Sequence, residues 1–427
     1  MKITTSYKVK IKHFNGIFRD TLKVYNDAAS FFIKVILKEW KYISSLSNMK
    51  AMTYIESITH KTKTYIPKYN FDKLFYKMPT YLRRAAIMEA LGMVSSYKSN
   101  HNNWLKDKKG KEPQIPKSGH LYPSLYSGNM FKFISNYEAK IKVYRNNTWN
   151  WLSVTLNKSD MDYLYKKGDL SSPTLIKIGK QFFLRFSHTD KVTLTNKNDI
   201  ICAVDLGLNN ACTIAIMRKD GTILSRDFLK LPSETDQLTH SCNLVKKAQQ
   251  HGANKTPRLW AKVNGINKHI SNETSLFIIN AAIKYNANVI VFEHLDIHGK
   301  KKFLKQRLHL WKYKQVLTVV ESKAHRLGMR VSTVNPNGTS KYAYDGSGPV
   351  IRNNKNHSIC KFTNGKIYNC DLSAAYNTGA RYYIRDILKS LDESSRLSIQ
   401  TKVSECLNRN TCTLSTLISL NAVIAAE

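Results

Sequence analysis

The chain has 427 residues, of which 42% are hydrophobic, so it is long enough to bury several cores and too apolar to be a disordered segment. Its 67 lysines and arginines face only 30 aspartates and glutamates, and the net charge of +37 indicates an anionic partner, with nucleic acid as the first candidate. No apolar run reaches the roughly 18 residues of a membrane span, and the N-terminal segment MKITTSYKVKIKHF lacks the apolar core of a signal peptide, so we expect no membrane partner.

Seven cysteines occur at irregular spacings, and two of them, Cys202 and Cys212, fall in apolar runs. An odd number without a regular pattern favours free, buried thiols in a reducing compartment over a disulfide framework. The chain contains no CxxC, HExxH or P-loop pattern.

The first half of the chain changes from a strand pattern to helices and back. Residues 1–13 alternate apolar and polar side chains, and residues 15–109 carry amphipathic helical periodicity. The polar, proline-bearing segment 106–119 is typical of a connector, and short strand patterns such as WNWLSVTL fill residues 120–199. This order predicts a β-barrel interrupted by a helical lobe, with basic and aromatic surfaces suited to nucleic acid.

The second half begins with three strands, the last two joined by the hairpin turn KDGT, and continues with alternating helices and strands. A polar loop then leads into a late helix that starts near residue 370, and we expect the final apolar segment to pack on the protein or on a partner. The predicted strands are 201–206, 211–217, 222–228, 287–295 and 329–336, and the predicted helices are 257–286 and 305–327.

Three carboxylates occupy marked places in this pattern. Asp205 and Glu293 end apolar strands, and Asp371 opens the late helix. Each has an ordinary explanation of its own, as a turn residue, an ion-pair partner and a helix N-cap, respectively. Together they match the RNase H-like connectivity, in which acids at these places meet at one edge of the sheet. Such acids need cations, and two Mg²⁺ ions about 3.5–4 Å apart would serve a phosphodiester displacement.

The stretches AVDLGLNNACTIA, VIVFEHL and DLSAAYN resemble the first, second and third RuvC motifs of the TnpB-type transposon-encoded RNA-guided nucleases and of the compact type V CRISPR effectors. The resemblance covers about residues 200–390 and extends to 1–199 only by the order of elements. It implies an RNA-guided DNA endonuclease in which Asp205, Glu293 and Asp371 are the catalytic ligands of two Mg²⁺ ions. It also implies two partners: a guide RNA of transposon-end or CRISPR origin, and double-stranded DNA with a short flanking motif. The expected location is the prokaryotic cytoplasm, in association with the nucleoid.

The resemblance implies a multidomain α+β fold: an interrupted wedge β-barrel with a helical recognition lobe, followed by an RNase H-like RuvC nuclease domain. The expected parts are a first barrel strand, the lobe, the rest of the barrel, the nuclease domain with motifs one and two, a degenerate zinc-ribbon insert, the motif-three helix and a tail. Their boundaries are 1–13, 14–110, 111–199, 200–336, 337–369, 370–390 and 391–427.

The insert departs from the family pattern, which places a zinc ribbon between the second and third motifs. Ala343 and Gly346 stand where the first two cysteines would fall, and Thr363 and Asn364 stand where the partner of Cys360 would fall. The remaining donors would be Cys360, His357 and Cys370. Because tetrahedral zinc needs four ligands, we expect no structural zinc.

Five further residues are candidates for nucleic-acid contacts: Arg83, Arg84, Trp104, Arg352 and Lys355. A surface ion pair and a core anchor are the alternatives for the first three. Two other functions stay open, a nuclease-inactive RNA-guided DNA-binding repressor and an RNase H-like nuclease that works without RNA. A homodimer is a further possibility, because the helical lobe is small.

Overall fold

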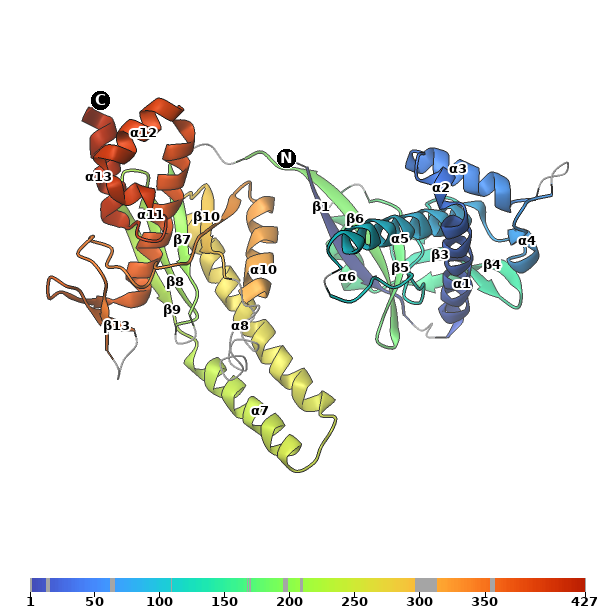
Figure 1. Ribbon diagram of the computed structural model, residues 1–427. Helices are drawn as coiled ribbons and strands as arrows, with labels where there is room; N and C mark the ends of the chain where they lie inside the picture. Colours follow the sequence, from blue (N-terminus) through green and yellow to red (C-terminus); the bar gives the residue numbers. More distant parts are fainter. Residues whose placement is uncertain are drawn as a thin grey trace. The chain divides into compact units, whose positions relative to one another are not determined.

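A computed structural model describes residues 2–12, 16–61, 66–108, 110–166, 168, 170–194, 199–207, 210–295, 313–353 and 358–426. The chain forms two compact α+β units, one of residues Thr4–Asp190 and one that combines Lys2 and Ile3 with the chain from Lys191 onward (Figure 1). No helix within the described ranges is long and apolar enough to cross a membrane.

The N-terminal unit packs long helices against two small sheets. The sheets have the strand orders β1-β6-β5 and β2-β3-β4. Helix α1 carries the core side chains Phe18, Tyr25 and Phe32, which are fully buried, on one amphipathic face. The strands are β1 (Lys2–Lys10), β2 (Phe131–Ser135), β3 (Glu138–Arg145), β4 (Thr148–Thr155), β5 (Thr174–Ile178) and β6 (Gln181–Lys191). The helices are α1 (Ile17–Lys38), α2 (Trp40–Ile43), α3 (Asn48–Thr59), α4 (Phe71–Leu74), α5 (Thr80–Asp107) and α6 (Lys158–Tyr165).

The predicted barrel is not closed among the residues that the structure describes. The chain after β1 reaches from one sheet toward the other, because Ile11 donates its N–H to the carbonyl of Phe182 at 3.0 Å and bridges Leu156. The β2–β3 pairing is irregular between Phe133 and Ser135, and such a bulge disrupts the ladder at a sheet edge. The unit therefore holds two linked three-stranded sheets in place of one continuous barrel.

The C-terminal unit is built on a five-stranded sheet of order β11-β10-β7-β8-β9. Strands β7, β8 and β9 form an antiparallel meander, and β10 lies parallel to both β7 and β11. All five predicted strands of this region are present. Their bounds are β7 (Ile200–Asp205), β8 (Cys212–Arg218), β9 (Ile223–Leu229), β10 (Val289–Glu293) and β11 (Arg330–Val334).

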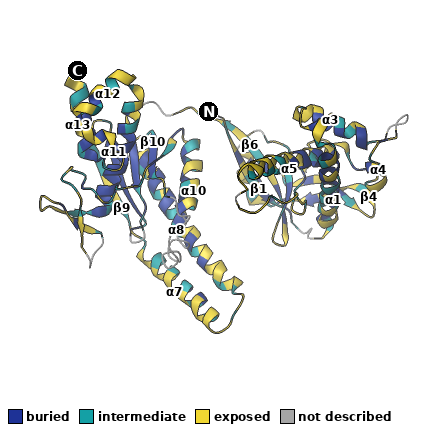
Figure 2. Ribbon diagram, viewed as in Figure 1, coloured by how far each residue is buried: buried dark blue, intermediate teal, exposed yellow. Residues whose placement is uncertain are grey.

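Helices cover both faces of this sheet, which is why its central strands are almost entirely apolar (Figure 2). Alternate residues point to opposite faces: Ala203 and Met217 pack with the C-terminal helices, and Cys202 and Val204 pack with α8 and α10. The final helix joins the first of these cores, so the apolar tail packs on the protein itself. The helices are α7 (Pro232–Gln250), α8 (Pro257–Lys284), α10 (Tyr313–Arg326), α11 (Cys370–Ser390), α12 (Glu393–Lys402), the 3₁₀ helix η1 (Ser404–Leu407) and α13 (Leu414–Ala426).

A glycine lets α11 lie close against the sheet. A Cβ atom on Gly379 would stand 2.1 Å from Met217 Sδ and 3.1 Å from Ala203 Cβ. Met217 is fully buried, so its side chain cannot move aside into solvent. The position of α11, and of Asp371 at its start, therefore depends on this contact.

The insert between β11 and α11 has a small apolar core of its own. Ala343, Cys360, Phe362 and Cys370 are buried together. They lie around the sheet of β12 (Ile351–Arg352), β13 (Ile359–Lys361) and β14 (Ile367–Asn369). All seven cysteines of the chain are free thiols, as predicted. Apolar packing of Ala343, Phe362 and the two thiols thus forms the core of the insert.

We expect Gly379→Ala to destabilise the protein by about 1–3 kcal/mol, because the added methyl group overpacks the contact with Met217. Denaturant unfolding measures this change. Gly265→Ala is the matched control, since no atom lies within 4 Å of its new Cβ in α8, and alanine is favoured there by up to about 1 kcal/mol. Equal effects of the two substitutions would contradict the close approach.

We also expect purified protein to contain less than one zinc per chain, measured by elemental mass spectrometry. Phe362→Ala should loosen the insert by about 3 kcal/mol, since a buried phenylalanine holds it together. Hydrogen exchange would then rise in β12, β13 and β14 and stay unchanged in β7. Stoichiometric zinc, or exchange that responds to a chelator, would contradict this account of the insert.

Candidate active site

The pairing of β7 with β10 brings two of the predicted acids together. Val204 lies opposite Phe292 in this parallel ladder, so the next residues, Asp205 and Glu293, are also neighbours. Adjacent strands are about 4.8 Å apart, and both side chains stand at the carboxyl ends of their strands. Both residues are half-buried. Two carboxylates thus share one edge of the sheet.

Asp371 is the second residue of α11 and does not cap it. The N-cap is Asn369, whose side chain accepts a hydrogen bond of 2.9 Å from the backbone N–H of Leu372. The ordinary explanation of Asp371 as a helix N-cap is therefore wrong. Its carboxylate instead accepts a hydrogen bond of 2.7 Å from the amide of Asn210, a buried residue shortly before β8.

The three acids act on one another electrostatically. Burial is the largest cause that raises the pKa of Asp205 well above its ordinary value, and repulsion from Glu293 and Asp371 raises it further, while Arg352 opposes the rise. Burial also raises the pKa of Glu293. Hydrogen bonds, among them the 3.3 Å bond from the Thr378 hydroxyl, oppose that rise. The charges of Glu293 and Asp371 thus both reach Asp205.

The chemistry of these donors fits a hard divalent cation. Carboxylate oxygens are the ligands that Mg²⁺ prefers, and a cation would relieve the repulsion that the three acids exert on each other. No group of three histidine, cysteine, aspartate or glutamate side chains in the described part of the chain is already arranged for metal binding. Coordination by Asp205, Glu293 and Asp371 would therefore need these side chains to move.

Of the two predicted contacts in the insert, one is described. Arg352 is exposed in β12 and donates a hydrogen bond of 3.3 Å to the carbonyl of Ser340. Its charge reaches Asp205, so it belongs to the surroundings of the acids. Lys355 lies outside the described residues, as does His357.

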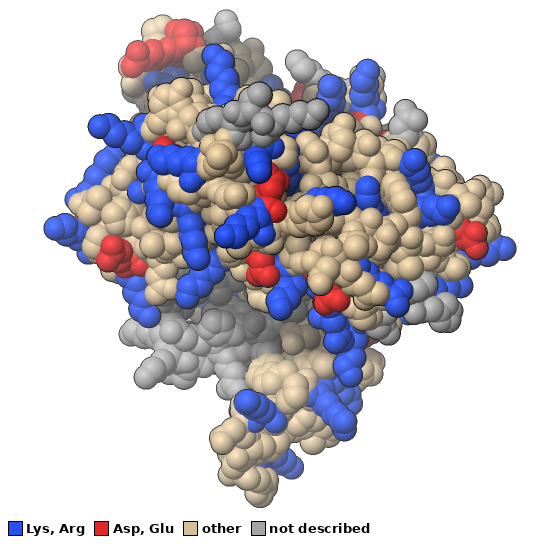
Figure 3. All heavy atoms as spheres, turned by 90° about the vertical axis from the view of Figure 1, so that its right-hand side faces the viewer, with Lys and Arg blue, Asp and Glu red and all other residues tan. Residues whose placement is uncertain are grey.

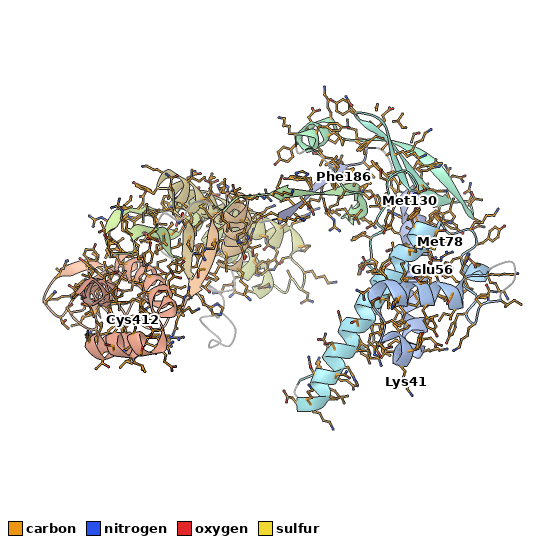
Figure 4. The ribbon with its side chains drawn as sticks, turned by 90° about the horizontal axis from the view of Figure 1, so that it is seen from above. Lys41, Glu56, Met78, Met130, Phe186 and Cys412 are labelled. Carbon is orange, nitrogen blue, oxygen red and sulfur yellow. The ribbon has the colours of Figure 1, made fainter. Side chains whose placement is uncertain are left out.

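The three residues of the helical lobe that we predicted to contact nucleic acid instead interact with other residues of the lobe. The guanidinium groups of Arg83 and Arg84 both pair with Glu56 of α3, at 3.1 and 3.0 Å (Figure 4). Arg83 is buried and presents nothing to a ligand in this conformation, whereas Arg84 stays partly exposed. The ring nitrogen of Trp104 lies 3.4 Å from the carbonyl of Gly110, and its ring is half-buried.

Four residues that support the acids were not predicted: Asn210, Thr339, Thr378 and Arg381. Asn210 lies inside the first motif, so the resemblance to that motif could have indicated it. Thr378 follows Asp371 by two helical turns and therefore lies on the same face of α11. Nothing in the local pattern distinguished Arg381.

Replacing Asp205 by asparagine should stabilise the metal-free protein at neutral pH, because it removes a half-buried carboxylate that Glu293 and Asp371 repel. A carboxyl group whose pKa is raised in the folded state opposes folding once the pH exceeds the pKa of the same group in the unfolded chain. The advantage of the variant should therefore shrink as the pH falls toward about 3.9, the ordinary pKa of an aspartate. Thermal unfolding in a chelator measures this, with Asp227→Asn, an exposed acid of β9, as control. A destabilised Asp205→Asn variant would contradict the repulsion.

The amino-acid sequence of the chain matches one family profile and proteins from other organisms. A sequence profile described as the Aq_aa04 family matches residues 5–145. A TnpB-like protein of Methanocaldococcus jannaschii is 26% identical over 162 residues, 35% of this chain and 58% of that protein. A TnpB-like protein of Aquifex aeolicus is 25% identical over 236 residues, 49% of this chain and 76% of that protein.

Solved structures give weaker matches. The structure of a Cas12f1–sgRNA–target DNA complex matches with a TM-score of 0.33 and 16% identity, over 88% of this chain and 99% of that one. A superposition of that quality does not by itself establish a common fold. The sequence matches are independent of it, although the chain spans little more than half of the M. jannaschii protein. This chain is related by sequence to proteins named TnpB-like, which confirms the resemblance that its three motifs indicate.

Proposed function

We propose that this chain is an RNA-guided DNA endonuclease with one RuvC-type site, formed by Asp205, Glu293 and Asp371. The observation that carries the proposal is the parallel pairing of β7 and β10, which sets Asp205 beside Glu293 at one edge of the sheet. The charge of Asp371 also acts on Asp205 there. The strand order of the C-terminal unit supports an RNase H-like fold for it. The sequence relationship to TnpB-like proteins supports the guide RNA and the DNA target.

The two units would divide the work. In this proposal the N-terminal unit corresponds to the wedge and recognition lobe and holds the guide RNA and the flanking motif of the DNA. Figure 3 shows a face on which lysine and arginine side chains far outnumber acidic ones. Such a surface suits the phosphates of RNA and DNA, because each neutralised phosphate releases counterions. The C-terminal unit would receive the strand that is cut.

Each residue of the site has a separate task in this proposal. Asp205, Glu293 and Asp371 hold the cations, and two bound Mg²⁺ ions would stabilise the attacking water and the leaving oxygen of a phosphodiester. Asn210 keeps the Asp371 carboxylate oriented through its 2.7 Å hydrogen bond. Arg352, exposed and close enough to act on Asp205, would pair with a phosphate of the bound strand.

Cleavage of a guide-matched plasmid by the ribonucleoprotein should fall by at least about a thousandfold in Asp205→Ala, because the metal ions supply several kcal/mol of transition-state stabilisation. Plasmid nicking and linearisation with and without Mg²⁺ measure this. Asp227→Ala is the matched control, an acid of the same sheet that is exposed on β9 and lies outside the three. Equal cleavage by wild type and Asp205→Ala would contradict the assignment of the site.

The same preparation separates the two alternatives. A repressor would bind the guide-matched DNA and leave it intact with Mg²⁺ present. A nuclease that works without RNA would keep its activity after the copurified RNA is removed, and its cleavage would not follow the guide. The proposal expects cleavage that needs both the guide and Mg²⁺.

A further inference from the structure

A cavity of about 430 Å³ lies in the C-terminal unit beside α11, where α12, η1 and the end of β11 meet it. Five cationic side chains line it, and no acidic side chain of the described residues does. Its cations are Arg381, Arg385, Lys389, Arg396 and Arg409. Five positive charges without an acidic side chain in the wall would attract an anionic ligand.

Three of these cations form one stripe on α11. Arg381, Arg385 and Lys389 are spaced four residues apart, so they share a face of the helix. Like charges at this spacing destabilise a helix. None of the ion pairs within the described ranges involves any of the five cations. The stripe would thus be relieved by a bound anion.

Two of the arginines are fixed in place before any ligand arrives. Arg381 donates hydrogen bonds of 2.7–3.1 Å to the backbone carbonyls of Asn335, Asn337, Asn410 and Cys412, the last of which is labelled in Figure 4. These acceptors are neutral and leave the guanidinium charge in place. The positive charge of Arg381 also acts on Glu293 of the candidate active site, where it opposes the rise in the pKa of that carboxyl group.

Arg385 is held in a similar way. Its guanidinium donates to the carbonyl of Thr333 and to the hydroxyl of Ser332, both at 2.7 Å, and lies over the ring of Tyr382. The cationic wall is therefore preorganised, which reduces the entropy lost when a ligand binds. Arg396 and Arg409 complete the wall from α12 and from the segment after η1.

The rest of the wall is mainly apolar, with Asn335 and Gln400 as its other polar side chains. Ile384 and Leu388 of α11 and Leu407 of η1 line the same cavity. A bare inorganic anion would leave this surface unused, whereas a nucleobase would cover it. The volume also lies in the range of small-molecule sites, about 300–1,000 Å³.

We propose that this cavity binds a nucleotide, with its phosphate on the arginine and lysine side chains and its base against Ile384, Leu388 and Leu407. The nucleotide is either free or the phosphorylated end of a nucleic-acid strand, since both present the same chemistry. The site uses none of the three carboxylates and does not require cleavage, although it shares Arg381 with the surroundings of Glu293.

Equilibrium binding to three probes tests the proposal: a fluorescent ADP, a short 5′-phosphorylated oligothymidylate, and the same oligonucleotide without its phosphate. Full-length protein carrying Asp205→Ala is used, so that no probe is cut and the result does not depend on nuclease activity. We expect the ADP or the phosphorylated strand to bind, and the double variant Arg396→Ala/Arg409→Ala to bind it at least about tenfold more weakly. Neither of these arginines takes part in the hydrogen bonds by which Arg381 is held.

Lys246→Ala/Lys247→Ala, on the exposed face of α7, is the control with the same change in net charge. It should leave binding within about twofold. ADP binding identifies a free nucleotide as the ligand, and binding of the phosphorylated strand alone identifies a strand end. Equal losses in the two double variants, binding of neither phosphorylated probe, or competition by inorganic phosphate as strong as by ADP would overturn the proposal.

Discussion

The parallel pairing of β7 with β10 is the constraint on which the candidate site depends. Because Val204 is opposite Phe292, Asp205 and Glu293 leave the sheet side by side. A shift of either strand by one residue would turn one of these acids toward the opposite face of the sheet. The helices on both faces oppose such a shift, since Cys202 and Ala203 are buried in two different cores. The apolar packing of the sheet therefore determines where the two charges stand.

This arrangement is unfavourable without a ligand. Asp205 is half-buried and repelled by two other acids. The opposing interactions are the amide of Asn210 on Asp371, the hydroxyls of Thr339 and Thr378 on Glu293, and the positive charges of Arg352 and Arg381. Strong repulsion at one edge of an otherwise apolar sheet is typical of functional sites, where charges are placed for a ligand and not for stability. The arginine-lined cavity beside α11 shows the same feature with the opposite sign.

The runs of apolar residues were enough to predict all five strands of the C-terminal sheet and to place Asp205 and Glu293 at strand ends, because burial on two faces leaves a nearly continuous apolar pattern. What could not be predicted depends on contacts between distant segments. Asn369, not Asp371, caps α11, and Gly379 is needed only because Met217 lies against it. Likewise, Arg83 is buried beside Glu56 from another helix, and the strands of the N-terminal unit divide into two three-stranded sheets.

The central claim is that Asp205, Glu293 and Asp371 converge on one cation site. Crystals of the protein soaked in Mn²⁺, which replaces Mg²⁺ and scatters anomalously, test this most directly. We expect anomalous peaks between these three carboxylates, and we expect them to disappear in Asp205→Ala crystals soaked in the same way. Peaks elsewhere in the molecule with none between the three carboxylates, or peaks that persist in the variant, would contradict it.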